Sequence, residues 1–268
     1  MCVNDILASG GEPLFFLDYF SSSKITGSHF LKIIKSINSG CIESGCSLIG
    51  GETAEMPGIY KKNDFDLAGF AIGAVERKNL ILKKNVMSGA ILLGLESSGF
   101  HSNGFSLIRK ILKRNRLCLE TKVPFKSKKK IIGEDFLIPT KIYVNELLPL
   151  VKKNLIASMA HITGGGIYEN LSRVIPKELI GVIDTEKFSI PERFLWLKNI
   201  AKISKIEMLN TFNCGIGMLM IINKENEKKV TQFLNKQSLK FFKLGEIQKN
   251  SKSSSNVCIR KFGEWHLT

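Results

Sequence analysis

Strand-like and helix-like apolar patterns alternate along almost the whole chain, and this alternation constrains the fold more than any other feature. Residues 14–20 combine aromatic and aliphatic side chains as a strand does, and residues 28–44 then place apolar side chains at helical spacing. Ser28 is a suitable N-cap for that helix, and Gly45 is expected to end it. The same change of period recurs toward the C-terminus, so we expect an α/β (α+β) fold.

A polar stretch at residues 76–89, rich in lysine and asparagine, interrupts this pattern and is typical of a domain junction. We therefore expect an N-terminal domain over residues 1–76 and a C-terminal domain over residues 77–268. The first would contain one helix and three strands, at residues 14–20, 46–49 and 65–75. These elements are too few for an independent core, so we expect an incomplete N-terminal sheet domain.

The second domain is expected to be a complete α/β domain. Its strands are predicted at residues 90–95, 157–162, 180–183, 217–222, 241–247 and 257–260. Its helices are predicted at residues 105–114, 141–152 and 226–235, with a further helix directly after Gly166.

The net charge of +15 at pH 7 comes from lysines that are spread along the chain rather than gathered in one segment. A protein that binds single-stranded nucleic acid interleaves its basic residues with aromatic side chains for base stacking, and we find no such interleaving. We therefore expect no nucleic-acid partner and attribute the excess charge to a lysine-rich proteome. A basic surface would still attract phosphorylated small molecules.

The six cysteines form no CxxC pair, which indicates a reduced protein with small buried thiols. No apolar run approaches the length of about 18 residues that a membrane span requires. The N-terminal segment also lacks the basic region of a signal peptide. These features predict a cytoplasmic protein without a membrane partner.

Two segments of the N-terminal half combine glycine with carboxylates. Asn4 and Asp5 precede a strand, where the carboxylate is either a helix N-cap or a hard oxygen ligand for Mg²⁺ bound to nucleotide phosphates. The second segment, residues 50–58, follows a short strand that we expect to be buried. A plain turn would explain its glycines but not two carboxylates at the end of a buried strand, so we favour a binding role. The candidates in this segment are Gly50, Gly51, Glu52 and Thr53.

Two further segments lie between a strand and a helix, where open α/β sheets bind ligands. The first contains the candidates His101, Ser102, Asn103 and Gly104. Taken alone, His101 is as well explained by a structural role as by a functional one. The second contains His161 and the candidates Thr163, Gly164, Gly165 and Gly166. Three consecutive glycines before a helix indicate a close backbone approach, and a phosphate is the natural guest. Neither segment is a P-loop or a GxGxxG fingerprint.

The segment around Asn213 and Cys214 precedes another apolar strand. A cysteine nucleophile would need a neighbouring base or an electropositive setting, and the sequence indicates neither. We therefore expect a structural role for this segment.

Together these segments resemble one family, the phosphoribosylformylglycinamidine cyclo-ligases, also called AIR synthetases. The matching segments follow the family order over essentially the whole chain: MCVNDILASGGEPLFFLDYF, GCSLIGGETAEMPGIY, SSGFHSNGFSLIRKIL, LIPTKIYV, AHITGGGIYENLSRVIP and TFNCGIGM. Other members of the superfamily, among them selenophosphate synthetase and thiamine-phosphate kinase, share the ND and TGGG elements. They match GGETAEMPG and HSNGFSLIRK less well.

The resemblance implies an AIR synthetase-like two-domain fold and a homodimer. It implies that ATP phosphorylates the formyl oxygen of formylglycinamidine ribonucleotide (FGAM), after which an amidine nitrogen closes the imidazole ring of 5-aminoimidazole ribonucleotide (AIR). Asp5 and Glu52 would bind Mg²⁺ and, with Asn4, Gly50, Gly51 and Thr53, the nucleotide phosphates. His101 to Gly104 would face the formylglycinamide end, Thr163 to Gly166 would hold the ribose phosphate, and His161 would donate a proton or position the substrate.

The sequence departs from the family at its start. Family chains carry a glycine-rich segment and a DGVGTK-like motif before MCVND, and neither is present here. Because that motif supplies a lysine and a metal carboxylate, we expect the chain as given to have weak or no cyclo-ligase activity. Two alternatives therefore stay open: a remnant that binds without catalysis, and another ATP-dependent kinase or synthetase of the same superfamily.

Overall fold

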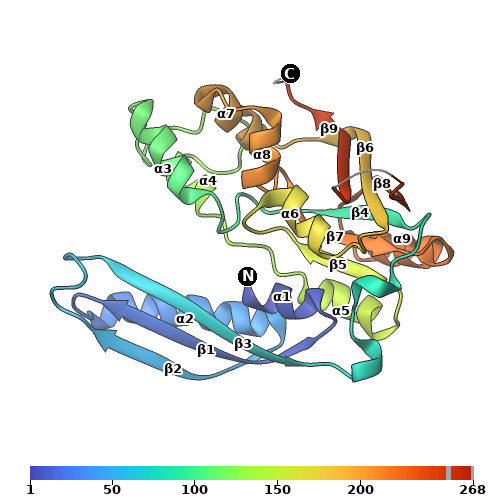
Figure 1. Ribbon diagram of the computed structural model, residues 1–268. Coiled ribbons are helices and arrows are strands. Elements are labelled where there is room, and N and C mark those ends of the chain that lie inside the picture. Colours follow the sequence, from blue (N-terminus) through green and yellow to red (C-terminus); the bar gives the residue numbers. More distant parts are fainter. Residues whose placement is uncertain (252–254, 267–268) are drawn as a thin grey trace. The chain divides into compact units, whose positions relative to one another are not determined.

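Two separate units make up residues 1–251 and 255–266, which are the residues that the computed structural model describes (Figure 1). The N-terminal unit contains Met1–Leu80 and Ile142–Lys153, and the C-terminal unit contains Ile81–Lys141 and Asn154–Thr268. The segment Ile142–Lys153 therefore belongs to the N-terminal unit, whereas the expected division of the chain at residue 76 places it in the second domain. Hydrogen bonds secure it there, because the Asn145 amide donates to the Glu43 carbonyl oxygen over 2.5 Å.

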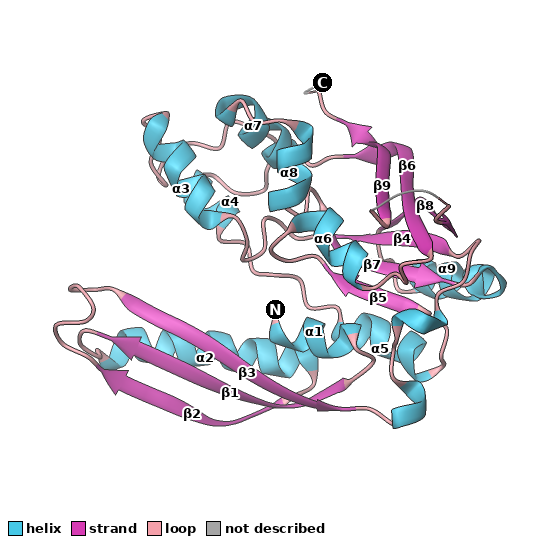
Figure 2. Ribbon diagram, in the orientation of Figure 1, coloured by secondary structure: helices cyan, strands magenta, loops and turns pink. Residues whose placement is uncertain are grey.

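The N-terminal unit is a three-stranded sheet covered on one face by helices (Figures 1 and 2). Its elements are α1 (Cys2–Ala8), β1 (Glu12–Ser22), α2 (Gly27–Ser44), β2 (Ser47–Glu55), β3 (Phe65–Ala74) and α5 (Val144–Lys152). The strand order is β2-β1-β3, with β1 parallel to β2 and antiparallel to β3. The expected strands at 14–20 and 65–75 and the expected helix are confirmed. Gly45 ends α2 with a φ of 71°, as predicted, but the N-cap is Thr26 rather than Ser28.

The strand expected at residues 46–49 is longer and more exposed than the sequence indicated. Strand β2 continues to Glu55, because β1 supplies a parallel partner as far as the pair Ser22 and Glu55. Gly51 permits this pairing, since a Cβ there would lie 2.1 Å from the Asp18 carbonyl oxygen. The glycines at 50 and 51 are thus part of a strand and not of a turn that follows one.

The face of this sheet opposite the helices is apolar and open. Phe15, Phe70 and Ile72 are 41%, 66% and 41% exposed, and the register pairs Phe15 with Ile72 across β1 and β3. Apolar patches of this kind on a sheet are typical of a protein interface.

The C-terminal unit contains a six-stranded sheet in the order β5-β7-β4-β8-β6-β9 (Figure 2). All neighbouring strands are antiparallel except β6 and β9. The strands are β4 (Ile91–Glu96), β5 (Ser158–His161), β6 (Leu179–Ser189), β7 (Ile216–Ile222), β8 (Phe241–Lys249) and β9 (Val257–Glu264). The helices are α3 (Phe105–Arg114), α4 (Ile132–Phe136), α6 (Gly166–Arg173), α7 (Glu192–Ala201), α8 (Lys205–Thr211) and α9 (Glu227–Lys236). Each strand and helix predicted for residues 77–268 is present, but the helix predicted at 141–152 is α5 and belongs to the N-terminal unit. Helices α4, α7 and α8 were not anticipated.

A cluster of four phenylalanines forms part of the core of the C-terminal unit. The ring of Phe100 lies 4.8 Å from Phe136, 4.7 Å from Phe194 and 5.6 Å from Phe212 between centroids. Each ring is at most 2% exposed. Burial of one such side chain stabilises a fold by about 1.5–3 kcal/mol, so the cluster anchors the residue that follows Phe100, His101.

The expectation of buried thiols holds for three of the six cysteines, whereas Cys118 is exposed and Cys2 and Cys258 are partly exposed. Cys41, Cys46 and Cys214 are buried, and burial together with the neighbouring Cys46 raises the pKa of the Cys41 thiol to about 12. This thiol therefore stays protonated. None of the helices in the described part of the chain has the length and apolar character of a membrane span.

Candidate functional site

The loop between β4 and α3, residues 97–104, carries four of the predicted site residues. It begins where the buried strand β4 ends, with the Ser97 amide bonded to the Gly215 carbonyl oxygen over 2.9 Å. The chain then turns sharply, because His101 has a φ of 57° and Gly104 a φ of 78°. Gly104 is required at its position, since a Cβ would lie 2.2 Å from the Phe212 ring.

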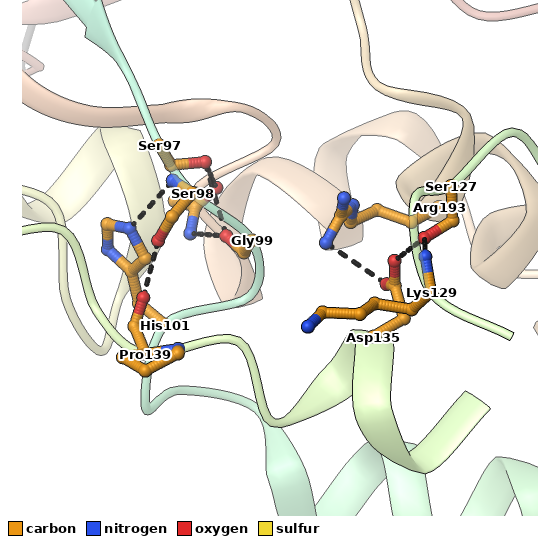
Figure 3. A network of polar contacts seen from close by, with 10 residues as sticks. Ser97, Ser98, Gly99, His101, Ser127, Lys129, Asp135, Pro139 and Arg193 are labelled. Carbon is orange, nitrogen blue, oxygen red and sulfur yellow. Dashed lines mark hydrogen bonds and ion pairs between the residues drawn. The ribbon is translucent and has the colours of Figure 1, made fainter. Parts of the chain in front are cut away.

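His101 lies inside this loop and is only 3% exposed (Figure 3). Its Nε2 accepts the backbone N–H of Ser98 over 3.2 Å and that of Lys141 over 3.5 Å. Burial and the neighbouring His161 lower the pKa of His101 to about 3, and the Lys141 cation acts in the same direction. Because Nε2 is an acceptor, the ring is neutral and its proton is assigned to Nδ1. That atom is buried and has no hydrogen-bond partner within the part of the chain that the structure describes.

The loop between β5 and α6, residues 162–165, lies beside the first one. The site at which a Cβ of Gly164 would lie is 4.0 Å from Oδ1 of Asn103. The Asn170 side chain holds this second loop, because its amide donates to the carbonyl oxygens of Gly164 over 3.1 Å and Gly166 over 2.7 Å. The Thr163 hydroxyl donates to Oδ1 of the same asparagine over 3.2 Å. The structure thus brings together the two segments that the sequence singled out in this unit.

One side of the glycine loop is better suited to an anion than the other. The Glu169 carboxylate lies over Gly165, where an added Cβ would meet its oxygen, and it is paired with Arg173. Among the described residues, the backbone N–H groups of Gly164 and Gly165 have no partner in the protein. Free N–H groups before a helix attract anions, so the Gly164 side of this loop, next to Asn103, is the side suited to an anion.

His161 ends β5 and is 4% exposed. It is close enough to His101 to lower the pKa of that residue. The two histidines therefore lie near each other and both are buried, which does not assign a role to His161.

The N-terminal unit places its candidates less favourably. Asn4 is fully buried, and its Oδ1 accepts the backbone N–H of Tyr143 over 3.0 Å, so this side chain fixes the segment that contains α5. Asp5 is exposed in the first turn of α1. Its carboxylate oxygens have the hard character that Mg²⁺ prefers.

Glu52 and Thr53 lie within β2, and Glu52 is exposed. A side chain at position 51 would point to the same face of the sheet as Asp18, which is the face that α2 covers. Because successive residues of a strand point to opposite faces, Glu52 points to the face that α2 does not cover. Helix α1, which carries Asp5, packs on the α2 face (Figure 1). The structure therefore does not bring Asp5 and Glu52 together within one copy. Among the described residues no group of three or more His, Cys, Asp or Glu side chains could hold a metal ion.

A second polar network, which the sequence gave no sign of, lies near the first loop (Figure 3). Asp135 is fully buried, and its carboxylate pairs with Nη1 of Arg193 over 3.0 Å and accepts the Ser127 hydroxyl over 2.5 Å. The Arg193 guanidinium in turn lies against Gly99, where an added Cβ would come within 3.0 Å of Nη1. This buried ion pair therefore packs against the first loop at Gly99.

Comparison with known proteins gives a consistent result. The sequence profile of "AIR synthase related protein, C-terminal domain" matches residues 88–258, and that of the corresponding N-terminal domain matches residues 1–75. A phosphoribosylformylglycinamidine cyclo-ligase of Neisseria gonorrhoeae is 47% identical over 248 residues, which cover 92% of this chain and 71% of the relative. The enzyme of the same name from Thermodesulfovibrio yellowstonii is 44% identical over 258 residues, covering 96% and 75%.

Solved structures show the same fold at low sequence identity. A thiamine-monophosphate kinase from Stenotrophomonas maltophilia K279a aligns with a TM-score of 0.70 at 14% identity, over 96% of this chain and 75% of the kinase. The hydrogenase maturation protein HypE in complex with ATP aligns with a TM-score of 0.67 at 15% identity, over 96% and 73%. At this identity the likeness concerns the fold alone.

Proposed function

The chain belongs to the AIR synthase related family, and on that premise we propose that it catalyses the ATP-dependent ring closure of FGAM to AIR, with release of ADP and phosphate. The observation that carries the proposal is the identity of 44–47% to cyclo-ligases over more than nine-tenths of this chain. The reaction belongs to purine biosynthesis. Nothing in the fold or the comparisons favours a remnant or another kinase of the superfamily.

In this proposal the C-terminal unit binds FGAM. The ribose phosphate would lie against Thr163 and Gly164 to Gly166, where unpaired N–H groups precede α6. The formylglycinamide end would lie against His101, Ser102, Asn103 and Gly104. Phosphorylation of the formyl oxygen makes phosphate the leaving group, and attack by the amidine nitrogen then closes the ring. Positioning and charge neutralisation supply most of the catalysis in such a transfer.

The nucleotide site is proposed for the N-terminal unit. Asp5 and Glu52 are separate candidate ligands for Mg²⁺, because both are exposed carboxylates and Mg²⁺ is commonly held by one or two carboxylates and the nucleotide phosphates. Gly50, Gly51, Thr53 and Asn4 are the further candidates of this site. HypE, which has the same fold, was solved with ATP, and this supports a nucleotide site in this chain. His161 is proposed as the group that donates a proton to the substrate or positions it.

We further propose that the protein is a cytoplasmic homodimer and that residues 1–76 and 77–268 are its evolutionary domains. The open apolar face around Phe15, Phe70 and Ile72 supports association of two copies, since such a face is costly to leave in water.

The proposed activity is tested by incubating the chain with FGAM, ATP and Mg²⁺. AIR, which is an aromatic amine detectable by diazotisation, should form in equal amounts with ADP and phosphate, at the low rate expected of the sequence as given. Calorimetry with FGAM alone tests the substrate site separately from turnover. Asn103→Ala should weaken FGAM binding, whereas Asn115→Ala, at the other end of α3, should not. Phosphate release that another acceptor stimulates and FGAM does not would contradict the proposal.

A further inference from the structure

Asn213, which the proposed reaction does not use, lies directly beneath the His101 loop. It is 2% exposed and comes just before strand β7. Its Nδ2 donates to the carbonyl oxygen of Gly99 over 2.8 Å. Its Oδ1 accepts the Ser97 hydroxyl over 2.9 Å and the backbone N–H of Gly215 over 2.8 Å. One buried side chain therefore connects two residues of the loop to Gly215, the residue that precedes β7.

Two further contacts restrain the same loop. Arg193, held by the buried Asp135, lies against Gly99. The Ser98 hydroxyl donates to the carbonyl oxygen of Pro139 over 2.6 Å (Figure 3). These contacts, together with the three hydrogen bonds of Asn213, restrain the loop.

This arrangement determines which nitrogen of His101 is the donor. Asn213 binds Ser97 and Gly99, and the N–H group that Nε2 of His101 accepts belongs to Ser98, which lies between them. With Nε2 occupied as an acceptor, the proton is on Nδ1. A buried hydrogen-bond donor without an acceptor lowers the stability of a fold. Nδ1 of His101 is buried and has no acceptor among the described residues. Such a donor marks a place where an acceptor atom of a ligand fits.

We infer, on the basis of the proposed function, that Asn213 is a positioning residue: it holds residues 97–101 so that His101 presents Nδ1–H to an acceptor oxygen of bound FGAM. In this inference His101 contributes as a neutral hydrogen-bond donor. Asn213 itself does not touch the substrate. The inference assigns a role beyond local structure to the segment that contains Asn213.

The test uses three variants of the full chain. Asn213→Asp keeps the shape and the acceptor but removes the donor to Gly99. Ser97→Ala removes one hydrogen bond to Asn213 and is the milder variant, should Asn213→Asp fail to fold. Asn256→Asp is the matched control, because the Asn256 amide also holds a chain segment, through the carbonyl oxygens of Ser172 and Ile175.

The main measurement is the NMR spectrum of ¹⁵N-labelled histidine, which distinguishes the Nδ1–H tautomer from the Nε2–H tautomer and from imidazolium. The chain has four histidines, and His101→Gln identifies the signal of interest. We expect His101 to be the Nδ1–H tautomer between pH 5 and 7.5 in the parent chain and in Asn256→Asp. In Asn213→Asp we expect His101 to be a mixture of the two tautomers, or to become imidazolium, between pH 5 and 7.5. We expect the same change to a smaller extent in Ser97→Ala.

The second measurement is the FGAM dissociation constant by calorimetry. We expect it to rise at least tenfold in Asn213→Asp and less than twofold in Asn256→Asp. An unchanged His101 tautomer in both Asn213→Asp and Ser97→Ala would overturn the inference, as would an equal change in Asn256→Asp. If the parent chain does not bind FGAM, the proposed function fails, whereas the tautomer in the free protein still decides the role of Asn213.

Discussion

The burial of a neutral His101 predicts how acid weakens the C-terminal unit. The perturbation is a fall in pH from 7 to 4, applied to the parent chain and to His101→Gln. Glutamine cannot titrate, but its side-chain oxygen can accept the Ser98 N–H in place of Nε2. The difference in unfolding free energy between the two proteins therefore isolates the proton that His101 takes up.

The direction and size of the effect follow from the two pKa values. In the unfolded chain His101 has its ordinary pKa of 6.5, whereas in the folded chain burial and His161 lower that pKa to about 3. Between these values the unfolded state binds a proton that the folded state does not, so stability falls as the pH falls below 6.5. One pKa unit corresponds to about 1.4 kcal/mol, so we expect the parent chain to lose roughly 3 kcal/mol more than His101→Gln by pH 4.

The assay is urea unfolding followed by tryptophan fluorescence. Both tryptophans, Trp196 and Trp265, lie in the C-terminal unit, so their signal reports the unit that contains His101. The free energy of unfolding is measured for both proteins at several pH values between 4 and 7. Any fixed cost of the substitution is the same at each pH and cancels. A constant difference between the two proteins across this range would refute the reasoning.

Three further substitutions test other parts of the structure. Gly166→Ala should destabilise the C-terminal unit by about 3 kcal/mol in urea unfolding, because the residue has a φ of 57° and an added methyl would lie 2.0 Å from a backbone oxygen of α8. Gly164→Ala should lower the free energy of unfolding far less, and equal effects of the two substitutions would contradict this reasoning. Asp135→Asn leaves a buried guanidinium without its counter-charge and should cost about 3–5 kcal/mol, whereas Glu169→Gln, in an exposed ion pair, should have no measurable effect. Phe70→Glu should shift the proposed dimer to monomer in analytical ultracentrifugation without unfolding the chain, and an unchanged mass would argue against the open sheet face as the interface.

The sequence predicted those parts of the fold in which local signals agree. Helix α2 ends at Gly45 because glycine there adopts the left-handed conformation, and the sequence shows both the apolar period and its end. Helix α3 begins after Gly104 for a similar reason, and its bounds were predicted to the residue. The two glycine-containing loops were also found, since each follows an apolar strand and precedes a helix.

Other features depend on partners that are distant in sequence. Strand β2 runs through Gly50 and Gly51 because β1 pairs with it, and local propensity alone indicates a turn there. Asp135 stands in a short helix without a periodic signal, so nothing in the sequence indicates that Arg193, far along the chain, would pair with it. Asn213 was expected to be structural, and only the hydrogen bonds reveal which loop it holds.

The proposed substrate residues and the proposed metal ligands belong to different units, and this has a consequence for the order of binding. The residues proposed for FGAM all lie in the C-terminal unit, where His101, Asn103 and Gly164 are already arranged by contacts within that unit. The proposed metal ligands Asp5 and Glu52 instead face opposite sides of the N-terminal sheet. Because the substrate site does not need those carboxylates for its shape, FGAM binding should require neither ATP nor Mg²⁺. Nucleotide binding should by contrast depend on conditions that bring further groups to the carboxylates, such as association of two copies.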